Sequence, residues 1–139
     1  MTKKENVVVP VASRLIKSRT EVGNLIKGQI KASEDLLNFV VDAQQGYSSV
    51  SFGTGRLRWV YDETQKESFF AAYHQWDDYN KEIFTRSFAD SNNTDKAGYE
   101  HAGYVGIILG NENVVNEQKK TIRKQVVYMQ GFLKRLPLV

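Results

Sequence analysis

The chain has 139 residues, of which 41% are hydrophobic and 12% aromatic, and its formal net charge is +3. This length fits a single domain with a real core, and this composition excludes general disorder. The lack of cysteine excludes disulfides and thiolate chemistry, and it also excludes a structural zinc site made of Cys and His. Because no apolar run approaches the roughly 18 residues of a membrane span or forms a signal peptide, we expect a cytoplasmic protein.

Residues 1–10 form a charged tail with a short apolar run, which we expect to lie extended between helices. A first helical region is predicted from about Val11. Ser18 and Glu21 resemble a capping box, so the long helix proper starts there and runs to about Ala43. Apolar residues recur in it at helical spacing, and Gly23 and Gly28 would allow a neighbouring helix to approach closely.

Residues 44–60 are rich in turn formers and small polar residues, which predicts a long loop and a good place for a binding surface. A brief hairpin through 48–52 and 56–60 is an alternative. The stretch 53–56, Gly-Thr-Gly-Arg, lacks the Lys and Ser or Thr of a phosphate-binding P-loop, so incidental arginines in a turn are favoured. The candidate binding residues of this region are Tyr47, Phe52, Arg56 and Arg58.

A second helix is predicted from about Asp62 to Ala89, and its aromatic density is typical of a buried central helix. Carboxylates at Asp77, Asp78 and Glu82 have a spacing that suits Mg²⁺ or acid–base chemistry, with Glu34 and Asp35 as the further candidate pair. Solvent exposure of these acids, with Lys81 between them, is the favoured interpretation. We therefore predict no metal site and no cofactor.

Residues 96–110 contain four glycines and predict a short helix, packed closely against its neighbours, that ends at Gly110. The chain has two histidines, His74 and His101. No serine lies in the strand–turn context of a nucleophile, and no arginine lies five residues before either histidine, so we assign both a structural role.

The last helix is predicted from Asn113 to Leu136, with Asn111 or Asn113 as its N-cap. Its apolar stripe includes Ile122, Val126, Met129 and Leu133, which predicts a seam that faces the core. A basic sector lies beside this stripe and supplies four further candidate binding residues, Lys119, Lys120, Arg123 and Lys124.

Charge is unevenly distributed along the sequence. Residues 1–61 hold nine basic and five acidic side chains, residues 62–100 four and nine, and residues 101–139 six and two. A nucleic-acid-binding protein usually keeps its basic excess unpaired. Here we expect the acidic middle to dock against the basic flanks and to neutralise much of the charge internally.

The stretch from Trp76 to Phe88 resembles a helix in the amino-terminal helical domains of bacterial defence-type proteins, where a tryptophan, two leucines and a phenylalanine have similar spacing. Helices like 25–37 and 114–136 flank it in those proteins, which continue into TIR-like or other nucleotide-handling effectors. This chain has Ile83 and Phe84 where two leucines are common. The resemblance implies a sensing, adaptor or oligomerising role.

The sequence predicts an all-α fold, an irregular bundle of three or four helices that forms one domain over residues 1–139. The favoured function is a non-catalytic domain for protein interaction, sensing or oligomerisation, with a protein partner or a second copy as its ligand. The alternatives are a nucleic-acid-binding module that uses the basic helix face and a small Mg²⁺-dependent hydrolase.

Overall fold

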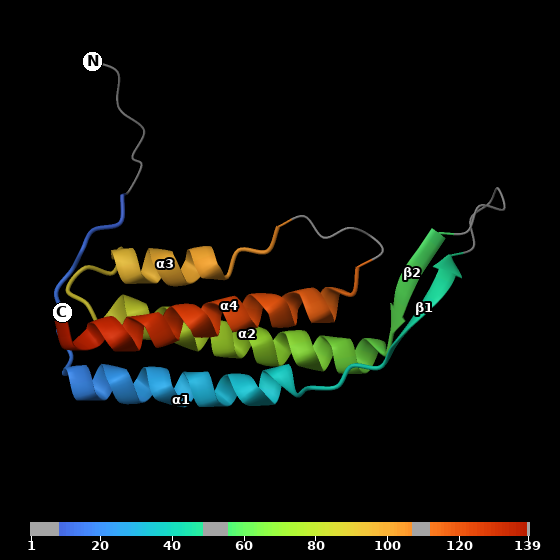
Figure 1. Ribbon diagram of the computed structural model, residues 1–139, viewed down its shortest axis with the longest axis horizontal. Coiled ribbons are helices and arrows are strands. Elements are labelled where there is room, and N and C mark those ends of the chain that lie inside the picture. Colours follow the sequence, from blue (N-terminus) through green and yellow to red (C-terminus); the bar gives the residue numbers. More distant parts are fainter. Residues whose placement is uncertain (1–8, 49–55, 107–111, 139) are drawn as a thin grey trace, which may run out of the picture.

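The computed structural model describes residues 9–48, 56–106 and 112–138, which form an irregular helical bundle with a small two-stranded sheet (Figure 1). The predicted all-α architecture is confirmed. In chain order the elements are α1 (Arg19–Leu37), β1 (Ala43–Ser48), β2 (Arg56–Tyr61), α2 (Glu63–Arg86), α3 (Thr94–Ala102), α4 (Val114–Arg135) and the 3₁₀ turn η1 (Leu136–Leu138).

Each of the four α-helices begins at a side-chain cap. The Ser18 hydroxyl accepts a hydrogen bond from the backbone N–H of Glu21 at 3.1 Å, as the capping box predicts. Asn113 caps α4 by accepting from the N–H groups of Val115 and Asn116. Asp62 and Asn93 cap α2 and α3 in the same way. Such caps satisfy backbone donors that a helix leaves unpaired. The starts of α1, α2 and α4 agree with the prediction, whereas α3 begins at Thr94, two residues before the predicted start at residue 96.

Three helix ends differ from prediction. Helix α1 ends at Leu37 rather than near Ala43, because the chain turns at Asn38 and the Phe39 ring then packs on Phe69 at 5.7 Å. Helix α2 ends at Arg86 rather than Ala89, and α3 ends at Ala102 rather than Gly110. Gly103 caps α3 and its N–H donates to carbonyls of the last turn. Residues 107–111 of the predicted helix lie outside the described residues.

The segment before α1 is extended, so the prediction of a helical region from Val11 is wrong. Val11 forms a parallel bridge with Asn93, and Leu15 an antiparallel bridge with Phe88. The Thr94 N–H donates to the Val11 carbonyl at 3.0 Å, and the Ile16 N–H to the Ser87 carbonyl at 2.9 Å. These backbone bonds tie the segment to the α2–α3 connection. Of the predicted tail, residues 1–8 lie outside the described residues.

The region predicted as a long loop contains an antiparallel hairpin that projects beyond the end of the bundle (Figure 1). The alternative prediction placed its second strand correctly but its first strand too late, because pairing starts at Ala43 opposite Tyr61. At the end of the hairpin nearest the bundle, the Asp62 N–H donates to the Asp42 carbonyl at 2.8 Å. Residues 49–55 lie outside the described part of the chain.

The core lies where α1, α2 and α4 meet, with α3 packed on α2 and α4. As predicted, α2 supplies buried aromatic rings, and the seam of α4 faces the core with Ile122 and Met129 fully buried. The Phe84 and Phe132 rings join the two helices edge to face, 5.2 Å apart. At Gly98 a Cβ atom would lie 2.5 Å from the Tyr128 hydroxyl oxygen, so glycine permits the close contact of α3 with α4.

Candidate functional site

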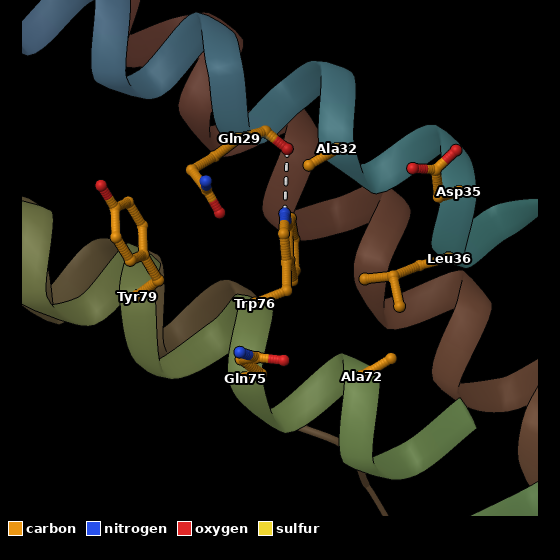
Figure 2. A pocket seen from close by; sticks show the side chains of 8 residues that line it. All are labelled: Gln29, Ala32, Asp35, Leu36, Ala72, Gln75, Trp76 and Tyr79. Carbon is orange, nitrogen blue, oxygen red and sulfur yellow. Dashed lines mark hydrogen bonds between the residues drawn. The ribbon is translucent and has the colours of Figure 1, made fainter. Parts of the chain in front are cut away.

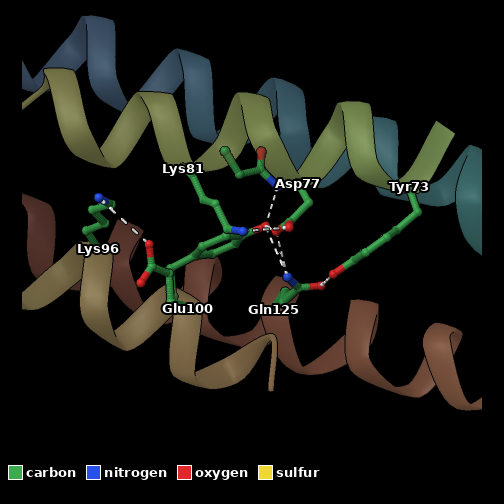
Figure 3. Close-up of polar contacts among 8 residues, drawn as sticks. Tyr73, Asp77, Lys81, Lys96, Glu100 and Gln125 are labelled. Carbon is green, nitrogen blue, oxygen red and sulfur yellow. Dashed lines mark hydrogen bonds and ion pairs between the residues drawn. The ribbon is translucent and has the colours of Figure 1, made fainter. Parts of the chain in front are cut away.

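A buried polar cluster joins α2, α3 and α4 around the carboxylate of Asp77 (Figure 3). One carboxylate oxygen accepts hydrogen bonds from the Tyr99 hydroxyl at 2.8 Å and from Gln125 Nε2 at 3.0 Å. The other lies 3.1 Å from Lys81 Nζ. The cluster extends on both sides, since the Tyr73 hydroxyl donates to Gln125 Oε1 at 3.3 Å and Asn80 Nδ2 donates to the Tyr99 hydroxyl at 3.0 Å.

The electrostatics of this cluster favour neutral tyrosines. Burial, reinforced by the nearby negative charge of Asp77, raises the pKa of Tyr73 to about 12. Burial also raises the pKa of Tyr99 far above its usual value. Although burial opposes it, the hydrogen bond with Asp77 raises the pKa of Lys81. Near neutral pH, Tyr73 and Tyr99 therefore keep their phenolic protons and Lys81 stays an ammonium group.

This arrangement suits a structural role better than a catalytic one. Three donors already bind the two oxygens of Asp77. A pocket of about 260 Å³ beside them is lined by Asp77, Lys81, Glu100, Gly103 and Gln125.

The expected exposure of Asp77 is wrong, since the residue is buried. Asp78 and Glu82 are exposed, and Glu82 pairs with Arg86 at 2.7 Å. Within the described residues, no three His, Cys, Asp or Glu side chains gather as a metal site.

The predicted binding residues of the hairpin region are only partly described. Tyr47 and Arg56 belong to β1 and β2, and Phe52 lies outside the described residues. Arg58 is exposed and pairs with Gly46 in the strand register.

On α4 the structure separates Lys119 from the other three predicted residues. Its Nζ donates to the Phe39 carbonyl at 2.6 Å, and burial, together with the charge of Arg123, lowers its pKa. Lys120 is exposed and pairs with Glu117 at 2.8 Å. Arg123 and Lys124 are also exposed. The structure therefore places three of these four cations at the surface and fixes the fourth against the end of α1.

The exposed face of α4 is more basic than the sequence counts indicated. Eight residues of α4 are exposed, five of them are cationic and none is acidic: Asn116, Lys120, Arg123, Lys124, Val127, Gln130, Lys134 and Arg135. The acidic middle segment does not neutralise this face as expected. In the described residues five of the ion pairs lie within single helices, and Arg135–Asp95 is the one that joins these two segments.

Helices α1 and α2 form an open groove of about 340 Å³ that sequence reasoning missed (Figure 2). Its floor contains Ala32, Leu36, Ala72 and Trp76, and its walls include Gln29, Asp35, Gln75 and Tyr79. The Trp76 indole N–H donates to the Gln29 carbonyl at 2.9 Å, which fixes the ring in place. Tyr79 is 50% exposed. Helical spacing marked Leu36 and Trp76 as core positions, but it could not predict that α1 lies opposite α2 at this groove.

A second hollow continues from Tyr79 toward the start of α1. It is lined by Lys17, Leu25, Tyr79, Glu82, Ile83 and Arg86. The two hollows differ in the charged residues that line them. Asp35 lines the first groove, whereas Lys17, Glu82 and Arg86 line the second hollow, where Glu82 pairs with Arg86.

Comparisons with protein-family models, curated proteins and solved structures found no match to this chain. The resemblance to helical domains of defence proteins therefore stays a prediction from sequence. Among the described residues, no helix is long and apolar enough to cross a membrane.

Proposed function

We propose that this chain is a non-catalytic protein-interaction domain and that the α1–α2 groove is its docking site. The observation that carries the proposal is an apolar floor left open beside a half-exposed aromatic ring, Tyr79, on a bundle whose other large aromatic side chains in α2 and α4 are mostly buried. Alanine at positions 32 and 72 keeps the floor low between Leu36 and Trp76. Grooves between helices commonly receive the apolar face of a further helix.

The surroundings of the groove favour a positively charged partner. Gln75, Asp78 and Glu82 follow one another on α2 at spacings of three and four, so they share one ridge. Gln75 lines the groove, and Asp78 and Glu82 are exposed. Asp35 lines the opposite wall on α1. The partner that fits is a helix with a small apolar residue flanked by lysine or arginine, placed toward Asp35 and away from Lys17.

A role in catalysis has less support, because internal donors already occupy both oxygens of the buried Asp77 carboxylate. A setting in bacterial defence and a cytoplasmic location rest on sequence reasoning alone and add nothing to the choice of site.

Tryptophan fluorescence tests the proposed site. The chain has two tryptophans, so Trp59→Phe leaves Trp76 as the only reporter, and Trp76 lines the groove. We expect a helical peptide with an alanine- and valine-rich face flanked by lysines to change Trp76 emission in a saturable way. The same peptide with glutamate in place of lysine should have little effect.

The control uses two exposed tyrosines. Tyr79→Ala in the Trp59→Phe background should weaken peptide binding about tenfold, since buried aromatic contacts often contribute most of the binding energy. Tyr104→Ala should leave it unchanged, because Tyr104 is 72% exposed and does not line the groove. Equal responses to both peptides, or no response to either, would contradict the proposal.

A further inference from the structure

We infer that the occupant of the groove is a second copy of this chain, which docks through the exposed face of α4. This inference rests on the proposed function, since it names the partner of the same groove. It predicts a heterologous contact, in which α4 of one copy meets α1 and α2 of the next.

The exposed face of α4 has the composition that the groove requires. Val127 is 65% exposed, although valine is an aliphatic residue that a helix of this bundle would normally bury. Arg123 and Lys124 precede it by four and three residues, so they flank it on the same side of the helix. Gly131 follows by four and adds no side chain. The result is a small apolar projection surrounded by cations.

Charge complementarity supports the match. The exposed part of α2 holds four acidic residues and one cation: Glu63, Glu67, Asp78, Glu82 and Arg86. The acidic excess comes from α2, because the exposed charges of α1 are balanced, with three acids and three cations: Glu21, Glu34, Asp35, Arg19, Lys27 and Lys31. Among the described residues, the five exposed cations of α4 form two ion pairs within their own chain, Lys120 with Glu117 and Arg135 with Asp95. A second copy offers both the apolar groove and the carboxylates.

The two surfaces belong to different helices of the same bundle, so a chain cannot close the contact on itself. Val127 remains exposed and the groove remains open in the same molecule. A contact between two different surfaces joins copies head to tail, so the copies form either a closed ring or an open chain with one free surface of each kind at its ends. The relevant observable is a size that grows with concentration.

A charge exchange tests the inference by sedimentation velocity at low salt. We expect the wild-type protein to self-associate with rising concentration. Reversal on α4, Arg123→Glu with Lys124→Glu, should weaken association about tenfold, and Asp35→Lys with Asp78→Lys should do the same. An equimolar mixture of the two variants should associate again, because each supplies the wild-type surface that the other lacks. All four positions are exposed, so the variants should fold.

The matched control for the α4 reversal is Arg14→Glu with Arg58→Glu, which lowers the net charge by the same amount at exposed positions outside both surfaces. It should associate like the wild type. A protein that stays monomeric at low salt, or a mixture that fails to recover, overturns the inference. If Trp76 still responds to the cationic peptide, the proposed docking site stands without it. If the α4 reversal abolishes salt-sensitive retention on heparin while self-association is unchanged, the face serves nucleic acid and the inference is wrong.

Discussion

Helices α2 and α4 resemble each other inside the bundle and differ outside it. Both bury aromatic or aliphatic side chains, and they meet at the polar cluster where Asp77 accepts from Gln125. On the solvent side, α2 exposes four acids and one cation, whereas α4 exposes five cations and no acid. A net charge of +3 conceals this separation. Which charged residues of a helix are exposed, more than the net charge of the chain, therefore decides which surfaces are complementary.

The largest effect is expected from breaking the inner contact between these helices. Asp77→Ala removes the acceptor of Tyr99 and Gln125 and leaves Lys81 without its partner. We expect the free energy of unfolding to fall by about 3 kcal/mol, because buried donors then lack acceptors. Urea unfolding of the wild type and the variant at neutral pH measures this loss of stability.

The control is Asp77→Asn, which keeps the shape and one acceptor oxygen and should cost less than Asp77→Ala. A loss below about 1 kcal/mol for the alanine variant would show that the cluster adds little to the contact between α2 and α4.

Two glycine substitutions test how closely α4 packs against α3. Gly98→Ala would place a Cβ atom 2.5 Å from the Tyr128 hydroxyl oxygen, so α3 must move from α4 or Tyr128 must lose its bond to Asp95. We expect a loss of about 2 kcal/mol in thermal or urea unfolding, despite the higher helix propensity of alanine.

Gly28 is the matched case, because nothing lies within 4 Å of a Cβ atom there, so the expectation that a neighbouring helix approaches closely at this glycine is wrong. Gly28→Ala in α1 should stabilise the protein by up to about 1 kcal/mol through helix propensity alone. If the two substitutions had the same sign, the close contact of α3 with α4 would not be what glycine provides at position 98.

Sequence reasoning succeeded where one residue's local chemistry decides the outcome. The capping residues Ser18 and Asn113 predicted the starts of α1 and α4, and the apolar stripe of α4 predicted the side of the helix that is buried. It failed where a distant partner decides. The segment at Val11 is extended because backbone groups near Asn92 and Asn93 receive it. The prediction ended α1 near Ala43, a position that pairs instead with Tyr61.

The site was harder to predict than the fold for the same reason. The pattern marked Trp76 as a core residue, and it does lie in the core, but its ring also forms the floor of a groove whose other wall comes from α1. The sequence predicted part of the basic face of α4, but it did not predict Val127 as a binding residue. An exposed valine indicates a contact only when the structure also shows a groove that fits it.

The smallest effect concerns pH and again involves the contact of α2 with α4. The Tyr73 hydroxyl donates to Gln125, and its pKa rises from 10.0 to about 12 through burial and the charge of Asp77. Between these values the folded state keeps a proton that the unfolded state loses, so stability is full below pH 10 and falls as pH rises toward 12. Between about pH 9 and about pH 11, the ionisation of Tyr73 should lower the free energy of unfolding by about 1 kcal/mol.

Urea unfolding of the wild type and Tyr73→Phe at both pH values isolates this contribution. Tyr99, Tyr128 and Lys81 also have raised pKa values, so they lower stability in the same direction in both proteins. The variant lacks the titrating hydroxyl and should therefore lose about 1 kcal/mol less than the wild type over this range. An equal loss in both would mean that Tyr73 ionises as readily in the folded state as in water, and hence that the interior between α2 and α4 is open to solvent at this point.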